Sequence, residues 1–245
     1  MSVRGHWGGS RRRILRHSGA VAGAQAELAE IQNAKSPAQA AGPDESIGRA
    51  VAALRAGEVV VYPTETFYGV GADAFAPAAL EQIFAIKGRE AARTIALIAH
   101  DEAAAFAIAR EVPDTARRLA RAFWPGPLTL VMPAREGLPA ALVGPDGGVG
   151  VRVSSHPVAR ALAQGLGRPI TATSANRSGG APARTIAQAR AALGDTVKVF
   201  VEGGTLAGGA PSTVVRCDRA GWRVLRAGAI SPDEIEAALS TGDGG

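Results

Sequence analysis

Apolar positions recur along this chain with two different periods, which predict alternating helices and strands. From Ile47 through Val51 to Leu54 the spacing is that of one helical face, and Gly57 marks the end of that helix. The next segment, 58–62 (EVVVY), is rich in β-branched residues and predicts a short strand. The chain therefore opens its folded part with a helix followed directly by a strand.

The same alternation continues to about residue 240. Further helices are predicted from Pro77, near 101–110 and 113–122, over 157–166, and from Ser231. Further strands are predicted at 94–99, 128–132, 149–153, 169–173, 197–201, 213–216 and 222–225. This order of elements predicts a single α/β (α+β) domain over 44–240, in which helices flank a twisted mixed sheet.

Residues 1–43 have a different character and are expected to form a disordered N-terminal extension. Residues 1–19 are rich in arginine and contain no acidic residue, which is typical either of an organelle transit peptide or of a disordered bacterial extension. An Ala/Gln/Glu stretch follows, and Ser36-Pro37 and Gly42-Pro43 interrupt it. The sequence leaves the role of this segment open.

The composition is that of a soluble globular protein, with 47% apolar and 20% charged residues. No apolar run reaches the roughly 18 residues that a membrane-spanning helix needs. Cys217 is the only cysteine, so no disulfide can form within the chain, and a reducing, cytoplasmic location is expected. Together with four scattered histidines, it gives no zinc ligand set, and no metal-ligating residue is predicted.

The formal net charge is +5, and much of the excess lies in the first 17 residues. This charge is compatible with solubility alone or with a site for anions such as a nucleotide or RNA.

Three polar segments are candidates for chemistry. The first, 63–69 (PTETFYG), is read as a loop leaving the EVVVY strand, with two threonine hydroxyls beside a carboxylate. Glycines at 69 and 71 are expected to let the backbone approach a ligand. An ordinary loop at the end of a strand would have the same local features.

The second segment is Lys87-Gly88-Arg89, with Arg93 four residues later. Gly88 suggests a turn that directs both cations to one place, where they suit phosphate and carboxylate groups. A basic helix end that neutralises its own last carbonyl groups is the alternative.

The third segment, 170–176 (ITATSAN), again follows a strand and carries short hydroxyl and amide groups. Arg152 and Arg226 add two cations in strand contexts, and a charge buried within VGVRV needs a partner. No P-loop, no dinucleotide fingerprint and no Ser-His-Asp spacing is found.

Taken in order, seven segments resemble the YrdC family of threonylcarbamoyl-AMP synthases, over roughly 45–232. The segments are YPTETFYGVGADA (62–74), IFAIKGRE (83–90), WPGPLTLVM (124–132), VGVRV with HP (149–157), PITATSANRSG (169–179), PSTVV (211–215) and LRAGAI (225–230). The resemblance implies a YrdC/RibB-like fold in its short, single-domain form. It also implies an enzyme that joins L-threonine, bicarbonate and ATP into threonylcarbamoyl-AMP and pyrophosphate, for the t6A37 modification of tRNA.

The resemblance also implies site residues. The family's KxR…SxN tetrad corresponds to Lys87, Arg89, Ser174 and Asn176. L-threonine would be held by Thr66, Arg152 and Ser212, and ATP by Arg89, Arg93, Ser174, Asn176 and Arg226. Mg²⁺ would accompany the triphosphate. Glu90 and Thr94 depart from the family pattern, which usually has proline after KxR and often has proline or glycine after the later basic position.

Two other functions compete with the synthase. One is a YrdC-like paralogue that binds double-stranded RNA with little synthase activity, and the other is a carbamoyl-transfer module of the hydrogenase-maturation type. The intact tetrad favours the synthase, while the single cysteine and short length disfavour the third function. As partners we expect the three substrates, tRNA or double-stranded RNA, and downstream the tRNA threonylcarbamoyl-transferase complex, but no membrane.

Overall fold

The computed structural model describes Met1 and residues 43–88, 94–177 and 179–240. The chain divides into two units, 1–41 and 42–245, and all of the elements below belong to the second. The predicted disordered extension therefore lies almost wholly outside the described residues. Arg89, Glu90 and Arg93 lie outside them too.

Helices and strands alternate in the described part of the chain, as the sequence pattern predicts. The helices are α2 (Pro43–Arg55), α3 (Pro77–Lys87), α4 (Glu102–Phe106), α5 (Asp114–Phe123), α6 (Pro157–Leu166), α7 (Ile186–Leu193) and α8 (Pro232–Ser240), with short 3₁₀ turns η1 (Ala140–Leu142) and η2 (Gly194–Thr196). The strands are β1 (Val60–Pro63), β2 (Tyr68–Gly71), β3 (Ala96–Ala99), β4 (Leu128–Pro133), β5 (Gly148–Val153), β6 (Ile170–Ser174), β7 (Val199–Phe200), β8 (Thr213–Asp218) and β9 (Gly221–Arg226).

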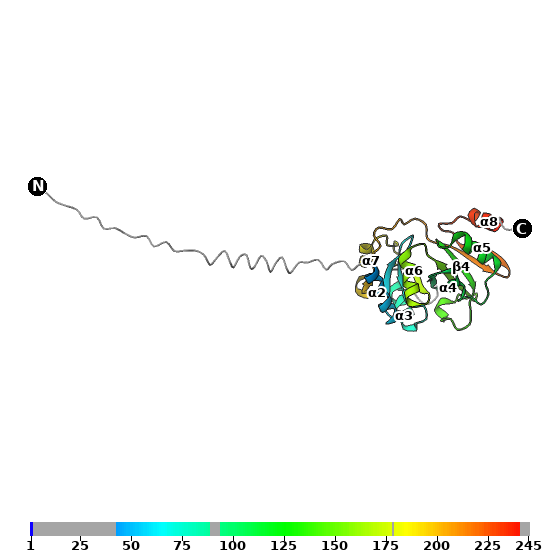
Figure 1. Ribbon diagram of the computed structural model, residues 1–245, viewed down its shortest axis with the longest axis horizontal. Helices are drawn as coiled ribbons and strands as arrows, with labels where there is room; N and C mark the ends of the chain where they lie inside the picture. Colours follow the sequence, from blue (N-terminus) through cyan, green and yellow to red (C-terminus); the bar gives the residue numbers. More distant parts are fainter. Residues whose placement is uncertain (2–42, 89–93, 178, 241–245) are drawn as a thin grey trace. The chain divides into compact units, whose positions relative to one another are not determined.

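The strands form one mixed sheet in the order β7-β1-β2-β6-β3-β5-β4-β8-β9. The pairs β1–β7, β3–β5 and β4–β8 are parallel, and the other neighbours are antiparallel. Figure 1 shows α2 and α6 towards one end of the sheet and α5 with α8 at the other. The predicted mixed sheet flanked by helices is confirmed.

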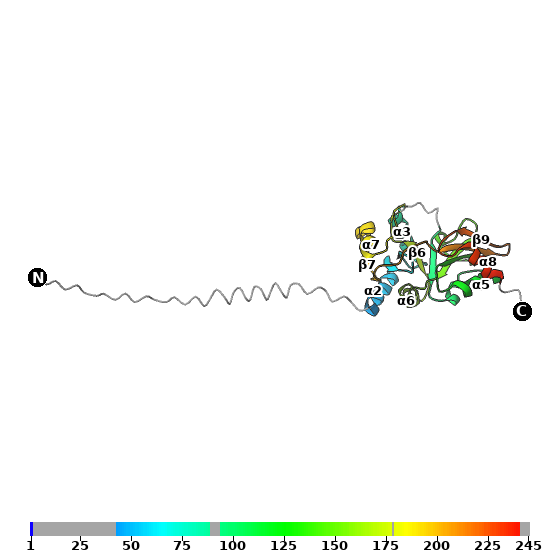
Figure 2. The same cartoon turned by 90° about the horizontal axis from the view of Figure 1, so that it is seen from above.

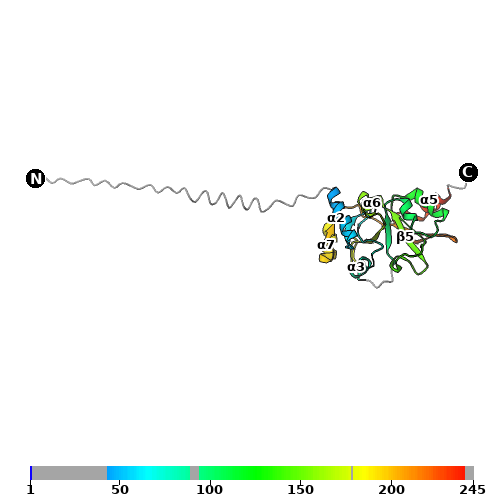
Figure 3. The same cartoon turned by 60° about the horizontal axis from the view of Figure 1, so that its bottom comes forward.

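Helices cover both faces of the sheet, and this explains the continuous apolar run of β1. Val61 belongs to the larger core, which also includes residues of α3 and α5. Val60 and Tyr62 belong to a second core formed with α2 and α6. Figures 2 and 3 show α3 and α6 on opposite sides of the sheet. A strand buried on both faces needs apolar residues at every position rather than at alternate ones.

Two elements were missed by the sequence pattern. The segment 63–69 is not simply a loop, because β2 begins at Tyr68 and pairs with β1 in an antiparallel hairpin. Helix α7 was not predicted at all, although Thr185 and Gln188 form a reciprocal capping box at its start. Of the predicted helix near 101–110, only the five residues of α4 are helical.

The glycines of β2 have a structural reason that differs from the predicted one. An added Cβ at Gly71 would lie 2.6 Å from Cε1 of Tyr62, and one at Gly69 would lie 3.2 Å from its Cζ. The Tyr62 ring is fully buried, and its hydroxyl donates to the carbonyl of Thr171 at 2.9 Å. The glycines make room for this ring, and Gly69 also lines the cavity described below, so the packing role stands beside the predicted approach to a ligand.

Gly71→Ala is therefore expected to destabilise the fold by about 1–3 kcal/mol, because the new methyl group overlaps a buried ring. Gly48→Ala is the matched control, since Gly48 lies within α2 with no atom within 4 Å of the added Cβ. That change should stabilise the helix by up to about 1 kcal/mol. Urea unfolding of both variants measures the difference, and equal midpoints would contradict the packing role.

Candidate active site

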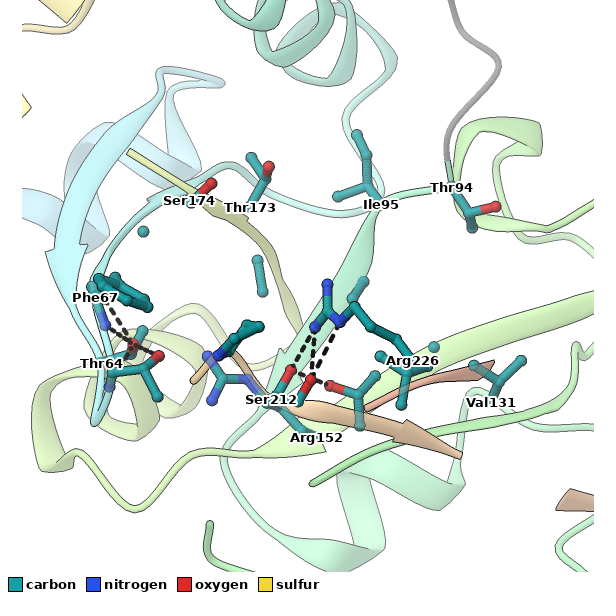
Figure 4. Close-up of a pocket in the computed structure, with 18 of the residues that line it drawn as sticks. Thr64, Phe67, Thr94, Ile95, Val131, Arg152, Thr173, Ser174, Ser212 and Arg226 are labelled. Atoms are coloured by element: carbon teal, nitrogen blue, oxygen red, sulfur yellow. Dashed lines mark hydrogen bonds between the residues drawn. The ribbon is translucent and has the colours of Figure 1, made fainter. Parts of the chain in front are cut away.

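One cavity of about 780 Å³ collects residues from segments that are far apart in the sequence. Six of the predicted site residues line it: Thr66, Lys87, Arg152, Ser174, Ser212 and Arg226. Figure 4 shows Arg152, Ser212 and Arg226 grouped on one side of the pocket, with Thr173 and Ser174 on another. The separate candidate segments therefore meet at a single place.

Thr66 is presented by the tight turn between β1 and β2. The hydroxyl of the buried Thr64 donates to the carbonyl of Phe67 at 2.6 Å and accepts from the backbone N–H groups of Thr66 and Phe67, both at 3.3 Å. These bonds close the turn on the side chain of Thr64. From the opposite side, the N–H of Gly208 donates to the Thr66 carbonyl at 3.1 Å. The turn is thus fixed from within and from the loop before β8.

Lys87 is the last residue of α3, and Gly88 ends the helix with a left-handed conformation (φ +57°). The lysine is only 3% exposed. Its Nζ donates to the carbonyl oxygens of Ser174 at 2.8 Å and Asn176 at 2.6 Å, and to Oδ1 of Asn176 at 3.1 Å. The ammonium group therefore holds the loop that follows β6.

Ser174 and Asn176 are joined to each other as well as to Lys87. The Ser174 hydroxyl donates to Oδ1 of Asn176, and Nδ2 of Asn176 donates to the carbonyl of Gly180. Asn176 is buried and does not line the cavity, whereas Ser174 does. Three members of the predicted tetrad form one hydrogen-bonded cluster, with Ser174 as its cavity-facing hydroxyl.

Arg152 lies on β5 in the middle of the sheet, and its side chain is 9% exposed. Burial, together with repulsion from Arg226, lowers the pKa of Arg152 to about 10, so the group remains charged at neutral pH. Its charge is balanced by Glu65, whose Oε1 accepts from Nη1 of Arg152. The other oxygen of Glu65 accepts from the hydroxyl of Ser154. The partner that a buried charge in VGVRV requires is therefore present.

Arg226 and Ser212 form a second polar group on the same side. The guanidinium donates to the Ser212 carbonyl from Nε at 3.2 Å and from Nη2 at 2.7 Å, and Nη2 also lies 3.0 Å from Oγ of Ser212. Thr129 Oγ1 lies 3.0 Å from the same hydroxyl oxygen. Burial lowers the pKa of Arg226. Both the cation and the serine hydroxyl are thereby held at the cavity wall.

A bulge in β9 explains how neighbouring residues reach the same cavity. Val214 pairs with Arg226, but Val215 pairs with Val224, so Leu225 is an extra residue in the ladder. Adjacent residues of a regular strand point to opposite faces, and a bulge changes this. Leu225 and Arg226 accordingly both line the cavity.

The sequence did not predict a role for Glu65 or Ser154. Glu65 accepts a hydrogen bond from Arg152, and Ser154 donates one to Glu65. Glu65 was visible as the carboxylate between two threonines, but its partner is 87 residues away. Arg89 and Arg93 stay predictions because they lie outside the described residues. Thr94, which departs from the family pattern, lines the cavity.

Among the described residues, no group of three or more His, Cys, Asp or Glu side chains is placed to hold a metal ion. Within the same part of the chain, no helix is both long and apolar enough to cross a membrane.

A family model for Sua5, YciO and YrdC proteins, described as telomere recombination, matches residues 52–228. The chain belongs to the Sua5/YciO/YrdC family. This match covers all of the cavity-lining predicted residues, from Thr66 to Arg226.

Several family members resemble the chain over most of its length. A putative threonylcarbamoyl-AMP synthase of Mycobacterium tuberculosis is 40% identical over 190 residues, which are 78% of this chain and 87% of that protein. The threonylcarbamoyl-AMP synthase of Thiobacillus denitrificans is 41% identical over 174 residues, which are 71% of this chain and 91% of that protein. The family resemblance seen in the sequence is thereby confirmed.

A solved structure shows the same fold. The crystal structure of Pyrococcus abyssi Sua5 complexed with L-threonine superposes with a TM-score of 0.75 at 35% identity. The match covers 79% of this chain and 57% of that one, so this chain spans little more than half the length of that Sua5. The predicted α/β fold of this family is confirmed.

Proposed function

We propose that this protein is an L-threonylcarbamoyladenylate synthase, which forms threonylcarbamoyl-AMP and pyrophosphate from L-threonine, bicarbonate and ATP. The observation that carries the proposal is the convergence of six residues, from Thr66 to Arg226, on one cavity. The names of the relatives above support the same activity, and the P. abyssi structure supports L-threonine as a substrate. The product would serve tRNA threonylcarbamoyladenosine modification.

The substrates carry a carboxylate, a bicarbonate and a triphosphate, and the cavity offers complementary groups. Arg152 and Arg226 are fixed cations, and Thr66, Ser174 and Ser212 are hydroxyl groups held by neighbouring hydrogen bonds or turns. Preorganised donors stabilise the charge that develops on phosphate oxygens during adenylyl transfer. With few groups suited to proton transfer, we infer that catalysis rests mainly on positioning the reactants.

Mg²⁺ enters this proposal as part of the substrate MgATP. The nearest carboxylate to the cations, Glu65, already accepts hydrogen bonds on both oxygens, and Asp146 at the cavity wall is paired with Arg216. Mg²⁺ is commonly bound through substrate phosphates and waters with only one or two protein carboxylates. The triphosphate would therefore supply most of its ligands.

The partners and location belong to the same proposal. The described residues contain 19 Lys and Arg against 18 Asp and Glu, so their charge gives little support to RNA binding as the main function. We infer a handover of product to the tRNA threonylcarbamoyl-transferase complex. The lone Cys217, which is buried, supports a cytoplasmic location.

Pyrophosphate release by the purified full chain tests the function. Release is expected only when MgATP, L-threonine and bicarbonate are all present, and omission of any one should reduce it to background. A folded protein that releases no pyrophosphate with all three present contradicts the proposal. Salt-sensitive binding of double-stranded RNA without pyrophosphate release would identify the paralogue instead.

A further inference from the structure

The surroundings of Arg152 raise the question of what holds its guanidinium in place. The side chain comes from the middle of the sheet and reaches a cavity that also contains Arg226, which repels it. An arginine side chain in such a place can adopt several orientations of its N–H donors. To bind a carboxylate in one defined geometry, it needs a partner that fixes the orientation of the guanidinium.

Glu65 is bonded through both of its carboxylate oxygens. One oxygen accepts from Nη1 of Arg152, and the other accepts from Oγ of Ser154. Ser154 is fully buried, and its Oγ also accepts from the N–H of His156 at 3.2 Å. The carboxylate is thereby fixed to β5 and its end, through a serine hydroxyl that the residue before α6 also contacts.

Glu65 also connects two parts of the cavity wall that are not neighbours in the sheet. It lies in the turn between β1 and β2, directly before Thr66, while Arg152 and Ser154 belong to β5 and its end. Strands β2 and β5 are separated in the sheet by β6 and β3. Neither Glu65 nor Ser154 lines the cavity, whereas Thr66 and Arg152 do.

We propose that Glu65, fixed by Ser154, is a positioning residue that sets the distance and orientation between Arg152 and Thr66 for binding the carboxylate of the amino-acid substrate. This inference rests on the proposed function and deepens it. Glu65 engages the guanidinium through Nη1, and the arginine side chain lines the cavity. Glu65 also balances the positive charge of Arg152 while the substrate is absent, without occupying the cavity itself.

The closing experiment compares Glu65→Gln with the wild-type full chain. The variant keeps the size of the side chain but removes the charge that balances Arg152. We expect the KM for L-threonine to rise about tenfold or more, and the KM for ATP to change less than about threefold. A purely structural role would lower the melting temperature and affect both substrates alike.

Two further variants complete the design. Glu58→Gln is the matched control, because Glu58 is an exposed carboxylate outside the cavity, and its KM values should equal those of the wild type. Ser154→Ala keeps the ion pair but frees one carboxylate oxygen. It should raise the KM for L-threonine by a smaller factor, about threefold, and it serves as the test if Glu65→Gln does not fold.

Titration calorimetry without ATP separates this inference from the proposed function. Wild type should bind L-threonine more tightly than L-threoninol, which lacks the carboxylate, and Glu65→Gln should lose most of that preference. The inference is overturned if the wild type and the folded variants bind L-threonine with equal affinity. It is also overturned if none of them binds L-threonine. Absence of pyrophosphate release by a wild type that binds L-threonine overturns the proposed synthase activity alone.

Discussion

Replacing Arg152 with alanine is expected to lower kcat/KM for L-threonine by at least about a hundredfold. The guanidinium is a buried cation of the cavity wall, and its removal takes away the donors proposed for the substrate carboxylate. It also leaves Glu65 as an unbalanced carboxylate beside the cavity, which would repel an anionic substrate. Pyrophosphate release at varied L-threonine and saturating ATP measures the loss.

The control for this change is Arg121→Ala, since Arg121 is an exposed arginine on α5 that does not line the cavity. Its kcat/KM should stay within about twofold of the wild type, as expected for a surface substitution. A folded Arg152→Ala protein with unchanged kcat/KM would show that the substrate carboxylate is bound elsewhere.

A double variant separates the stability of the Arg152–Glu65 pair from its use in binding. Arg152→Met alone leaves a partly buried carboxylate without its cation, which is expected to destabilise the fold by up to about 3 kcal/mol. Adding Glu65→Gln removes that carboxylate charge and should restore much of the stability. The affinity for L-threonine should not return, because no cation has been restored. If the double variant recovered both its stability and its affinity for L-threonine, Arg152 would have a structural role alone.

The regular part of the fold is predictable from local pattern, and the exceptions are informative. The EVVVY run predicts β1 because a strand buried on both faces is apolar throughout. Strand β2 escapes prediction because its glycines are required by the ring of Tyr62, on the neighbouring strand. A side chain that occupies the space of a missing Cβ leaves no local signal in the sequence of β2.

Some residues of the site were likewise predictable from the sequence, and others were not. Motif order identifies Lys87, Arg152 and Ser212, and the structure brings them to one cavity. Considered one at a time, each segment could equally be an ordinary turn or helix end or part of a binding site. Glu65 and Ser154 could not be assigned from the sequence, because the contacts of Glu65 with Arg152 and with Ser154 depend on how the β1–β2 turn meets the end of β5.

Replacing Lys87 with methionine is expected to reduce kcat by about a hundredfold and the free energy of unfolding by about 2–4 kcal/mol. Methionine retains an unbranched apolar stem but has no ammonium group. The carbonyl oxygens of Ser174 and Asn176 would then lose the ammonium donor, and the Ser174 carbonyl would keep only the backbone N–H of Asn176 at 2.9 Å. The loop carrying the Ser174 hydroxyl would no longer be held against the end of α3.

Urea unfolding and pyrophosphate release should be measured on the same samples. Lys198→Met is the matched control, because Lys198 is exposed and lies outside the cavity, and both measurements should match the wild type. A Lys87→Met protein with wild-type activity would contradict a role for the lysine in the site.

The two measurements together distinguish how Lys87 acts. If it acts by holding the loop, stability and activity fall together, and the KM for ATP rises because Ser174 is displaced. If the ammonium also releases the loop and contacts the substrate during turnover, kcat falls while the KM for ATP stays near that of the wild type. The contacts of Lys87 favour the first result, since three oxygens of the loop accept from the same nitrogen. In that case the three described members of the tetrad form a scaffold in which a buried lysine fixes the position of a serine hydroxyl.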